Sequence, residues 1–308
     1  MAPLTLAATA FFALPAVSAV AVPDVEISPG VKMPMIAFGT YRHSLTTCSV
    51  VEGVDQWLQL GGRHIDTAHD YGTEPDVGEA LKKSDVKREE IFITTKIPGP
   101  IGADAVQKMV LEETLPKLGV DYVDLLLIHF PCVDQQDFPN ACGSKGRKER
   151  LDTWHGITQL RKNGKVRAIG VSNYLAEQVN EVIEEFKEAP AVNQVEWHLA
   201  YHNETLRAAM HSYGTTLEAW ASLAGPTGQG SPSISLGDER LKKVAGRYGM
   251  STAQLELRWE TQRGVVPVTA TCTKDHAVGD LNAFNFTLSA KDLDYLDSLK
   301  ADMEMFVL

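Results

Sequence analysis

Short apolar runs alternate with amphipathic stretches along most of this chain. Each run is bounded by polar or glycine-containing segments and predicts a short strand. The predicted strands are residues 35–40, 63–66, 91–96, 123–129, 166–173, 191–197, 215–221 and 265–270. Between them, segments such as 50–62, 105–119, 153–165 and 176–188 place apolar residues three or four positions apart, which predicts amphipathic helices. A Pro-Gly pair at positions 29 and 30, between two short alternating runs, indicates a β-hairpin before the first of these strands.

The regular alternation of strand and helix requires parallel strands joined by right-handed crossovers. A doubly wound open sheet that binds a dinucleotide is expected to carry a G-x-G-x-x-G loop after its first strand, and this chain has none. Eight strand–helix units over about 250 residues instead match an α/β (β/α)8 TIM barrel. In that fold the chemistry lies at the carboxyl ends of the strands.

Four polar residues collect at those predicted strand ends. Asp66, Lys96 and His129 end three successive strands, and Tyr71 lies in the loop after Asp66. Alone, each residue has an ordinary structural explanation, but their joint position at one end of adjacent strands favours a catalytic group. Tyrosine donates or accepts a proton poorly near neutral pH unless a neighbouring cation stabilises its anion. We expect Lys96 to do so, Asp66 to keep Lys96 charged, and His129 to position a carbonyl oxygen. Because none of these groups supplies a hydride, the chemistry requires a cofactor.

Charge and composition narrow the partners and the compartment. The net charge is −11, and the short basic segment 143–150 is expected to be a solvated loop, so nucleic acid is not an expected partner. Residues 1–21 are apolar and end in an A-x-A pattern at Ala19 and Ala21, which predicts a secretory signal peptide. An uncleaved anchor or an organellar leader remains the alternative, with a cytoplasmic or organellar location. No other segment has the length and hydrophobicity of a membrane span.

The four cysteines show no metal-ligand spacing. If the protein enters an oxidising compartment, we expect Cys132 and Cys142, which bracket one short polar loop, to form a disulfide. Four reduced thiols in a cytosolic enzyme are the alternative. Two glycosylation sequons, at Asn203 and Asn285, matter only if the leader is functional.

Several long motifs resemble those of the aldo-keto reductases. They are GVKMPMIAFGTY, GGRHIDTAHDYGTEPDVGEAL, REEIFITTKI, LGVDYVDLLLIHFP, GKVRAIGVSNY and AVNQVEWH, in this order, and the resemblance covers residues 24–308 as one barrel domain. It implies NAD(P)H-dependent reduction of a small aldehyde or ketone to an alcohol. By the same resemblance, Tyr71 is the proton donor, tuned by Asp66 and Lys96, and His129 orients the substrate.

The resemblance also assigns binding roles. It implies that Ser172, Asn173 and Gln194 hydrogen-bond the nicotinamide carboxamide and that Trp220 stacks on the nicotinamide ring in place of the usual tyrosine. Thr40 and Tyr41 are expected to line the cofactor and substrate side of the first loop, and Phe130 to form an aromatic wall of the substrate pocket. The remaining cofactor contacts are expected at Leu223 and Thr271.

The chain departs from the family at the end that holds the cofactor's phosphates. After the last strand, VTATCTKDH (268–276) places Ala270 where the family has a lysine and His276 where it has an arginine, with Lys274 nearby but displaced. These basic residues usually bind the 2′-phosphate of NADP, so the preference for NADP or NAD stays open. ASLAG (221–225) is also altered, and the Gly-, Pro- and Ser-rich segment 225–238 is a candidate flap over the pyrophosphate.

Two other functions remain compatible with the sequence. One is a weakly active or inactive barrel that binds a nucleotide or small ligand in a regulatory role, which the altered cofactor loop motivates. The other is a non-redox isomerase or lyase that uses Tyr71 and Lys96 for proton transfer alone.

Overall fold

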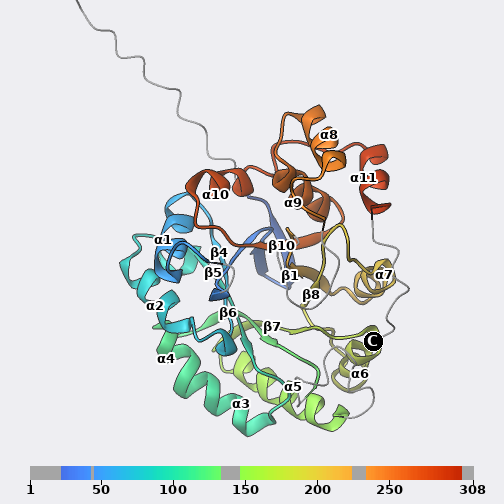
Figure 1. Ribbon diagram of the computed structural model, residues 1–308. Helices are drawn as coiled ribbons and strands as arrows, with labels where there is room; N and C mark the ends of the chain where they lie inside the picture. The colour runs from blue at the N-terminus through green and yellow to red at the C-terminus, as the bar shows by residue number, and fades with distance from the viewer. Residues whose placement is uncertain (1–21, 43–44, 133–145, 224–233, 300–308) are drawn as a thin grey trace, which may run out of the picture.

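The computed structural model describes residues 22–42, 45–132, 146–223 and 234–299. Within these ranges, eight parallel strands form a closed barrel in the order β10-β3-β4-β5-β6-β7-β8-β9. Helices surround the strands on the outside (Figure 1). The predicted (β/α)8 fold is therefore confirmed.

All eight predicted strands are present, with bounds shifted by at most two residues. Each is a short, nearly continuous apolar run because both of its faces are covered, one by the barrel interior and one by the helices. The barrel closes where β10 pairs with β3, aligning Val268 with Ala37. The strands are β3 (Ala37–Gly39), β4 (His64–Asp66), β5 (Phe92–Ile97), β6 (Val123–Ile128), β7 (Val166–Ser172), β8 (Val192–Glu196), β9 (Thr216–Trp220) and β10 (Val265–Thr269).

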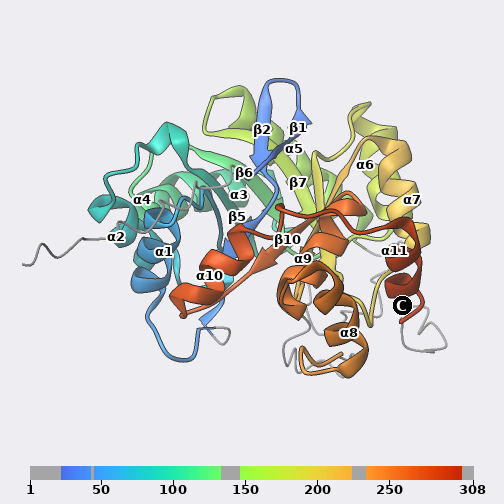
Figure 2. The same ribbon diagram turned by 90° about the horizontal axis from the view of Figure 1, so that it is seen from above.

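The predicted hairpin precedes the barrel and covers the amino ends of its strands. It consists of β1 (Asp24–Ser28) and β2 (Val31–Pro34), paired antiparallel. Its apolar side chains Ile27, Val31 and Met33 join a buried cluster with Phe92 and Val266, which begin or nearly begin their strands. Figure 2 shows the hairpin at one end of the barrel. The hairpin thus closes the barrel at the amino ends of its strands, which leaves the carboxyl ends as the place for a functional site.

The helices pack their apolar faces on the outside of the barrel. Helix α1 begins with a capping box, in which the Ser49 hydroxyl accepts from the backbone N–H of Glu52 and the Glu52 carboxylate accepts from the backbone N–H of Ser49. In the described ranges no helix is long and apolar enough to cross a bilayer, and the predicted leader lies outside those ranges. The longer helices are α1 (Val50–Gln59), α2 (Glu74–Lys83), α3 (Ala103–Met109), α5 (Arg147–Lys162), α6 (Ala176–Phe186), α7 (Glu204–Tyr213), α8 (Glu239–Tyr248), α9 (Thr252–Gln262), α10 (Lys274–Leu281) and α11 (Ala290–Asp297).

Two local predictions need correction. The helix predicted at 105–119 is interrupted after α3 by a π-helical turn, η4 (Val110–Thr114), before α4 (Leu115–Leu118). Pro116 lacks an N–H and its ring crowds the preceding turn, so the wider turn accommodates it. The basic segment was predicted to be a solvated loop, but its described part begins α5, and Arg150 is buried and pairs with Glu181 at 2.7 Å. Residues 143–145 of that segment lie outside the described ranges.

A disulfide joins Cys48, before α1, to Cys272, after β10. This pair was not predicted from the sequence. Cys132 is also disulfide-bonded, while Cys142, its predicted partner, lies outside the described residues. The alternative of four reduced thiols is therefore wrong for these three cysteines. The Cys48–Cys272 bond lies where the first and last barrel strands pair, and it links the first strand–helix unit to the last.

We expect the double variant Cys48→Ser/Cys272→Ser to fold with reduced stability. The bond closes a loop of 224 residues, and the lost restriction of the unfolded chain corresponds to about 5 kcal/mol as an upper value. Urea unfolding without reductant measures the difference. Equal unfolding free energies for the variant and the unmodified protein would contradict a stabilising role for this bond.

Candidate active site

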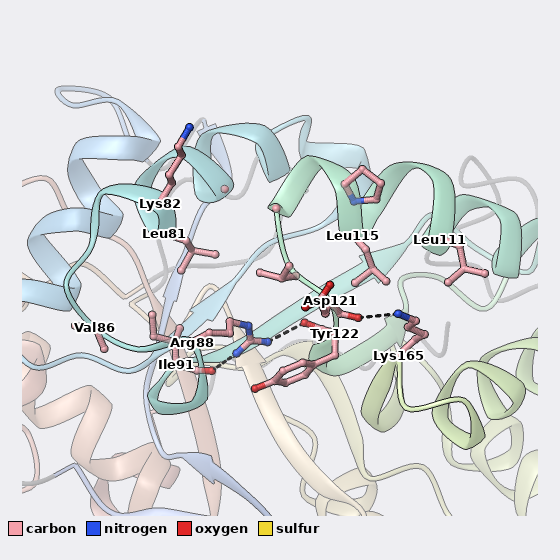
Figure 3. A pocket seen from close by; sticks show the side chains of 14 residues that line it. Leu81, Lys82, Val86, Arg88, Ile91, Leu111, Leu115, Asp121, Tyr122 and Lys165 are labelled. Atoms are coloured by element: carbon pink, nitrogen blue, oxygen red, sulfur yellow. Dashed lines mark hydrogen bonds between the residues drawn. The ribbon is translucent and has the colours of Figure 1, made fainter.

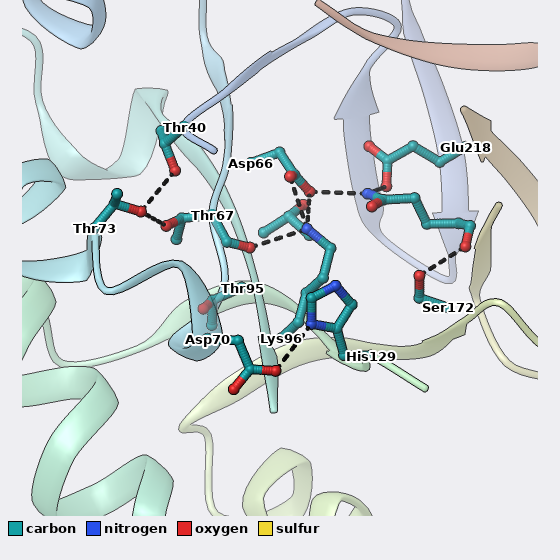
Figure 4. A network of polar contacts seen from close by, with 12 residues as sticks. Thr40, Asp66, Thr67, Asp70, Thr73, Thr95, Lys96, His129, Ser172 and Glu218 are labelled. Atoms are coloured by element: carbon teal, nitrogen blue, oxygen red, sulfur yellow. Dashed lines mark hydrogen bonds and ion pairs between the residues drawn. The ribbon is translucent and has the colours of Figure 1, made fainter. Parts of the chain in front are cut away.

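The four predicted catalytic residues meet at the carboxyl end of the barrel. Asp66 is the last residue of β4, Lys96 is the penultimate residue of β5, and His129 follows β6 directly. Tyr71 ends the short 3-10 helix η2 (His69–Tyr71). Its ring centre lies 5.1 Å from Nζ of Lys96 and 5.6 Å from the His129 ring. Figure 4 shows Asp66, Lys96 and His129 converging from separate strands.

A buried ion pair forms the centre of this group. Nζ of Lys96 donates to both carboxylate oxygens of Asp66, at 2.7 and 2.8 Å, and to the carbonyl oxygen of Thr67 at 3.0 Å. Burial alone would favour the neutral amine, but the Asp66 carboxylate together with Tyr71 and Glu218 outweighs it, and the pKa of Lys96 is raised. Lys96 is therefore a fixed cation at neutral pH.

Two opposing effects act on the Tyr71 hydroxyl. Burial raises the pKa of Tyr71, and the charge of Lys96 and its hydrogen bond to the hydroxyl only partly offset this. The expected stabilising effect of Lys96 on the tyrosine anion is thus present, but burial outweighs it in the protein alone. Tyr71 is held as a protonated hydroxyl beside a cation. Tyr41, predicted to line the first loop, packs its half-exposed ring 5.1 Å from that of Tyr71.

His129 is placed by contacts on two sides. Its ring stacks on Phe130 with centroids 4.4 Å apart, and its Nδ1 lies 3.4 Å from a carboxylate oxygen of Asp70. Burial lowers the pKa of His129, although the Asp70 carboxylate acts against this. His129 is therefore a neutral imidazole at neutral pH, and Phe130 forms an aromatic surface next to it.

The residues expected to bind the nicotinamide form a connected group across β7, β8 and β9. The Ser172 hydroxyl donates to the main-chain oxygen of Gln194 at 2.7 Å, and Asn173 Nδ2 donates to the main-chain oxygen of His129 at 3.0 Å. Trp220 Nε1 donates to Asn173 Oδ1 at 3.0 Å. Gln194 Nε2 lies between the carboxyl groups of Asp66 and Glu218, at 2.8 and 2.7 Å. These contacts link the expected cofactor group directly to the Lys96–Asp66 pair.

Backbone strain marks the same region. Asn173 and Ala221 have backbone φ angles of 62° and 60°, in the left-handed region that residues other than glycine rarely adopt. Each follows a residue of the expected nicotinamide group, Ser172 and Trp220. Unfavourable backbone conformations of this kind occur preferentially at functional sites.

The loop bearing Tyr71 rests on buried threonines. The Thr73 hydroxyl is 3.1 Å from that of Thr40 and 3.0 Å from that of Thr67. Thr40 was predicted to line the cofactor side of the first loop, and its hydroxyl is engaged in this network. The three threonines connect β3, β4 and the start of α2, which fixes the position of Tyr71.

The opposite part of the expected cofactor region lies around the end of β10. Ala270 and Leu223 are partly buried against the core, and Thr271 accepts from the backbone N–H of Thr273 at 3.1 Å. Lys274 and His276 are exposed in the first turn of α10. The altered loop thus brings no cation to position 270, although two basic side chains lie nearby in sequence.

Comparison with known proteins agrees with this geometry. The model of the aldo/keto reductase family matches residues 35–301. The chain belongs to the aldo-keto reductase family. It is 34% identical to the glyoxal reductase of Bacillus subtilis over 90% of this chain and 93% of that protein. It is 31% identical to the 9,11-endoperoxide prostaglandin H2 reductase of Trypanosoma cruzi, over 90% of this chain and 92% of that protein. The Bombyx mori aldo-keto reductase AKR2E4, solved in complex with NADP, superposes with a TM-score of 0.82 at 31% identity, covering 92% of this chain and 94% of that one.

The active site of this aldo-keto reductase also contains two residues, Asp70 and Glu218, that were not predicted from the sequence. Asp70 immediately precedes Tyr71, and this neighbouring position was the only feature of the sequence that could have indicated its contact with His129. Glu218 lies in the middle of β9, where alternation along the strand would have indicated that it faces the barrel interior with Trp220. In the described ranges no three His, Cys, Asp or Glu side chains are grouped as metal ligands would be.

A separate hollow of about 680 Å³ lies at the other end of the barrel, between α2 and α4 (Figure 3). Its lining includes Arg88, Ile91 and Tyr122, which lie just before the amino ends of β5 and β6. Arg88 is engaged there, donating to Asp124 at 2.7 Å and to the main-chain oxygen of Tyr122 at 2.9 Å. The hollow lies at the amino ends of the strands and is therefore separate from the reductase site at their carboxyl ends.

Proposed function

We propose that this aldo-keto reductase reduces a small aldehyde or ketone with a nicotinamide nucleotide, and that Tyr71 donates the proton. The observation that carries the proposal is the placement of a protonated hydroxyl on the partly buried Tyr71 beside the Lys96–Asp66 pair and the His129 ring. A carbonyl oxygen in contact with Tyr71 would develop negative charge next to a fixed cation. Stabilisation of developing charge by a pre-positioned group is typically the largest contribution to such catalysis.

The residues present fit the nicotinamide part of the cofactor. Because both hydrogens of the Gln194 amide nitrogen face carboxyl groups, its orientation is fixed and its oxygen remains the group that would accept from the carboxamide. Ser172 and Asn173 lie beside it, and Trp220 offers an aromatic face for stacking. A bound reduced nucleotide supplies the hydride.

Each side chain has a distinct part in the proposed proton transfer. Tyr71 gives its hydroxyl proton to the carbonyl oxygen as that oxygen becomes an alcohol. Lys96 then stands next to the resulting tyrosine anion, and Asp66 keeps Lys96 charged and oriented. His129 positions the carbonyl oxygen by a hydrogen bond, with Phe130 and Tyr41 as the aromatic surroundings of the substrate.

Replacing Tyr71 by Phe is expected to lower kcat/KM for aldehyde reduction by at least about a hundredfold, since the proton donor is lost. Nucleotide binding, measured by quenching of Trp220 fluorescence, should be retained. Tyr295→Phe, at an exposed tyrosine of α11, is the matched control and should keep full activity. Unchanged turnover in Tyr71→Phe would remove Tyr71 from its assigned role, and failure of both NADH and NADPH to bind would refute the reductase function.

We further propose that the enzyme uses NADH at least as readily as NADPH. Ala270 offers no charge to a 2′-phosphate, and each missing charge-assisted hydrogen bond corresponds to about 1.5 to 3 kcal/mol. His276, at the other family position, is a weaker partner than arginine because an imidazole ring lacks the bidentate fork of the guanidinium group.

The double variant Ala270→Lys/His276→Arg is therefore expected to bind NADPH more tightly by about tenfold or more. The affinity for NADH should stay within about twofold and serves as the internal control. Kd values from fluorescence titration of both nucleotides in both proteins provide the measurement. An unmodified protein that already prefers NADPH strongly, with no gain in the double variant, would contradict this proposal.

We also propose that the protein is exported through residues 1–21. In support, Cys48, Cys132 and Cys272 are disulfide-bonded, and structural disulfides persist mainly in oxidising compartments. The sequon residues Asn203 and Asn285 are both exposed. Mass spectrometry of the N-terminus of the natural protein should show that it begins near Val22. A protein retained inside the cell with Met1 in place would argue against export.

A further inference from the structure

A second carboxyl group lies inside the barrel next to the Lys96–Asp66 pair. Glu218 of β9 is fully buried, and its Oε2 accepts from Gln194 Nε2 at 2.7 Å. The same nitrogen donates to Asp66 at 2.8 Å, so one amide group bridges two carboxyl groups (Figure 4). The chain of contacts from Glu218 to Lys96 thus passes through Gln194, the residue placed against the nicotinamide carboxamide.

The cations around Glu218 do not balance its charge. Lys96 already binds both oxygens of Asp66. His64 Nε2 lies 3.7 Å from Glu218 Oε1, but its ring nitrogens bond to the Pro34 carbonyl and the Thr94 hydroxyl, and burial lowers the pKa of His64 to about 4. Among the described residues, Glu218 Oε1 has no hydrogen-bond partner.

Glu218 is therefore a neutral acid at neutral pH. Burial, reinforced by the charge of Asp66, raises the pKa of Glu218 to about 8, while the hydrogen bond from Gln194 and the charge of Lys96 act against it. The neighbouring strand β10 adds no titratable side chain, since its sequence is VVPVT. An uncompensated carboxylate here would face a large desolvation cost, which protonation removes.

The nicotinamide ring changes its charge during the reaction, because it is cationic when oxidised and neutral when reduced. We propose that Glu218 couples the oxidation state of the bound nucleotide to a proton: the oxidised, cationic ring favours the Glu218 carboxylate, and the reduced ring favours the acid. The proton leaves to the solvent when the oxidised form binds and returns when the reduced form replaces it. This inference rests on nicotinamide binding beside Gln194 in the proposed function, and it makes Glu218 a positioning residue that acts through its charge.

The coupling has a measurable sign. Because linkage is reciprocal, the affinity for the oxidised nucleotide must rise relative to that for the reduced nucleotide as pH increases through the ionisation of Glu218. We expect the affinity for the oxidised nucleotide, divided by that for the reduced nucleotide, to increase by about tenfold between pH 6 and 9.5. A tenfold change corresponds to a Glu218 pKa that differs by about one unit between the two complexes. Titration of the 2′-phosphate affects both forms alike and cancels in the ratio.

The experiment measures Kd for NADP+ and NADPH, and for NAD+ and NADH, by Trp220 fluorescence across this pH range. In Glu218→Gln the affinity ratio should be independent of pH within about twofold. Glu256→Gln is the matched control, because Glu256 is another buried carboxyl whose pKa burial raises to about 8, but it lies on α9 outside the contact chain. This control should retain the pH-dependent ratio.

Calorimetry of the unmodified protein near pH 8, in two buffers of different ionisation enthalpy, provides a test that needs no variant. Release of a fraction of a proton is expected with the oxidised nucleotide and not with the reduced one. An affinity ratio that does not change with pH in the unmodified protein would overturn the coupling. So would an equal pH dependence of this ratio in Glu218→Gln and in the unmodified protein. If no nucleotide binds at any pH, the proposed function itself fails, so the two failures are distinguishable.

Discussion

The ion pair between Lys96 and Asp66 is the interaction on which the rest of the site depends. Both residues are buried, and removing one partner of such a pair typically costs about 3 to 5 kcal/mol because the other charge is left without compensation. Asp66 accepts from both Lys96 and Gln194, and thus fixes the cation and the expected carboxamide partner at once. Tyr71, His129 and the residues proposed to bind the nicotinamide are all arranged around this one carboxylate.

The barrel supplies the geometry that makes the pair possible. Parallel strands deliver their carboxyl ends to one mouth, while the hairpin β1–β2 fills the opposite end with apolar side chains. Asp66 aligns with Thr94 of the neighbouring strand, which brings the Lys96 side chain over it. The Cys48–Cys272 bond holds together the first and last strand–helix units, where the loops around the cofactor region begin.

Much of this could be predicted from the sequence, and the parts that could not share a physical reason. Strands buried on both faces appear as short apolar runs, so the barrel followed from their spacing, and Asp66, Lys96 and His129 were identified because they end such runs. The Cys48–Cys272 pair was missed because residues 224 positions apart meet only once the barrel closes. Glu218 was missed because its role depends on Gln194 of another strand. The effect of Lys96 on Tyr71 could be predicted from the sequence, but the net rise of the Tyr71 pKa could not, because only the folded structure shows that burial outweighs the nearby cation.

That balance also bears on the proposed proton transfer. A tyrosine whose anion is favoured overall would be ready to remove a proton from an alcohol, whereas Tyr71 is held as a protonated hydroxyl. Lys96 nevertheless remains charged close to it and can stabilise the anion as soon as the proton has left. In the proposed reaction, the proton thus stays on Tyr71 until its transfer, and Lys96 stabilises the negative charge that develops during the transfer. Such an arrangement suits the proposed proton donation by Tyr71, and it arises from enclosing one cation and one tyrosine together.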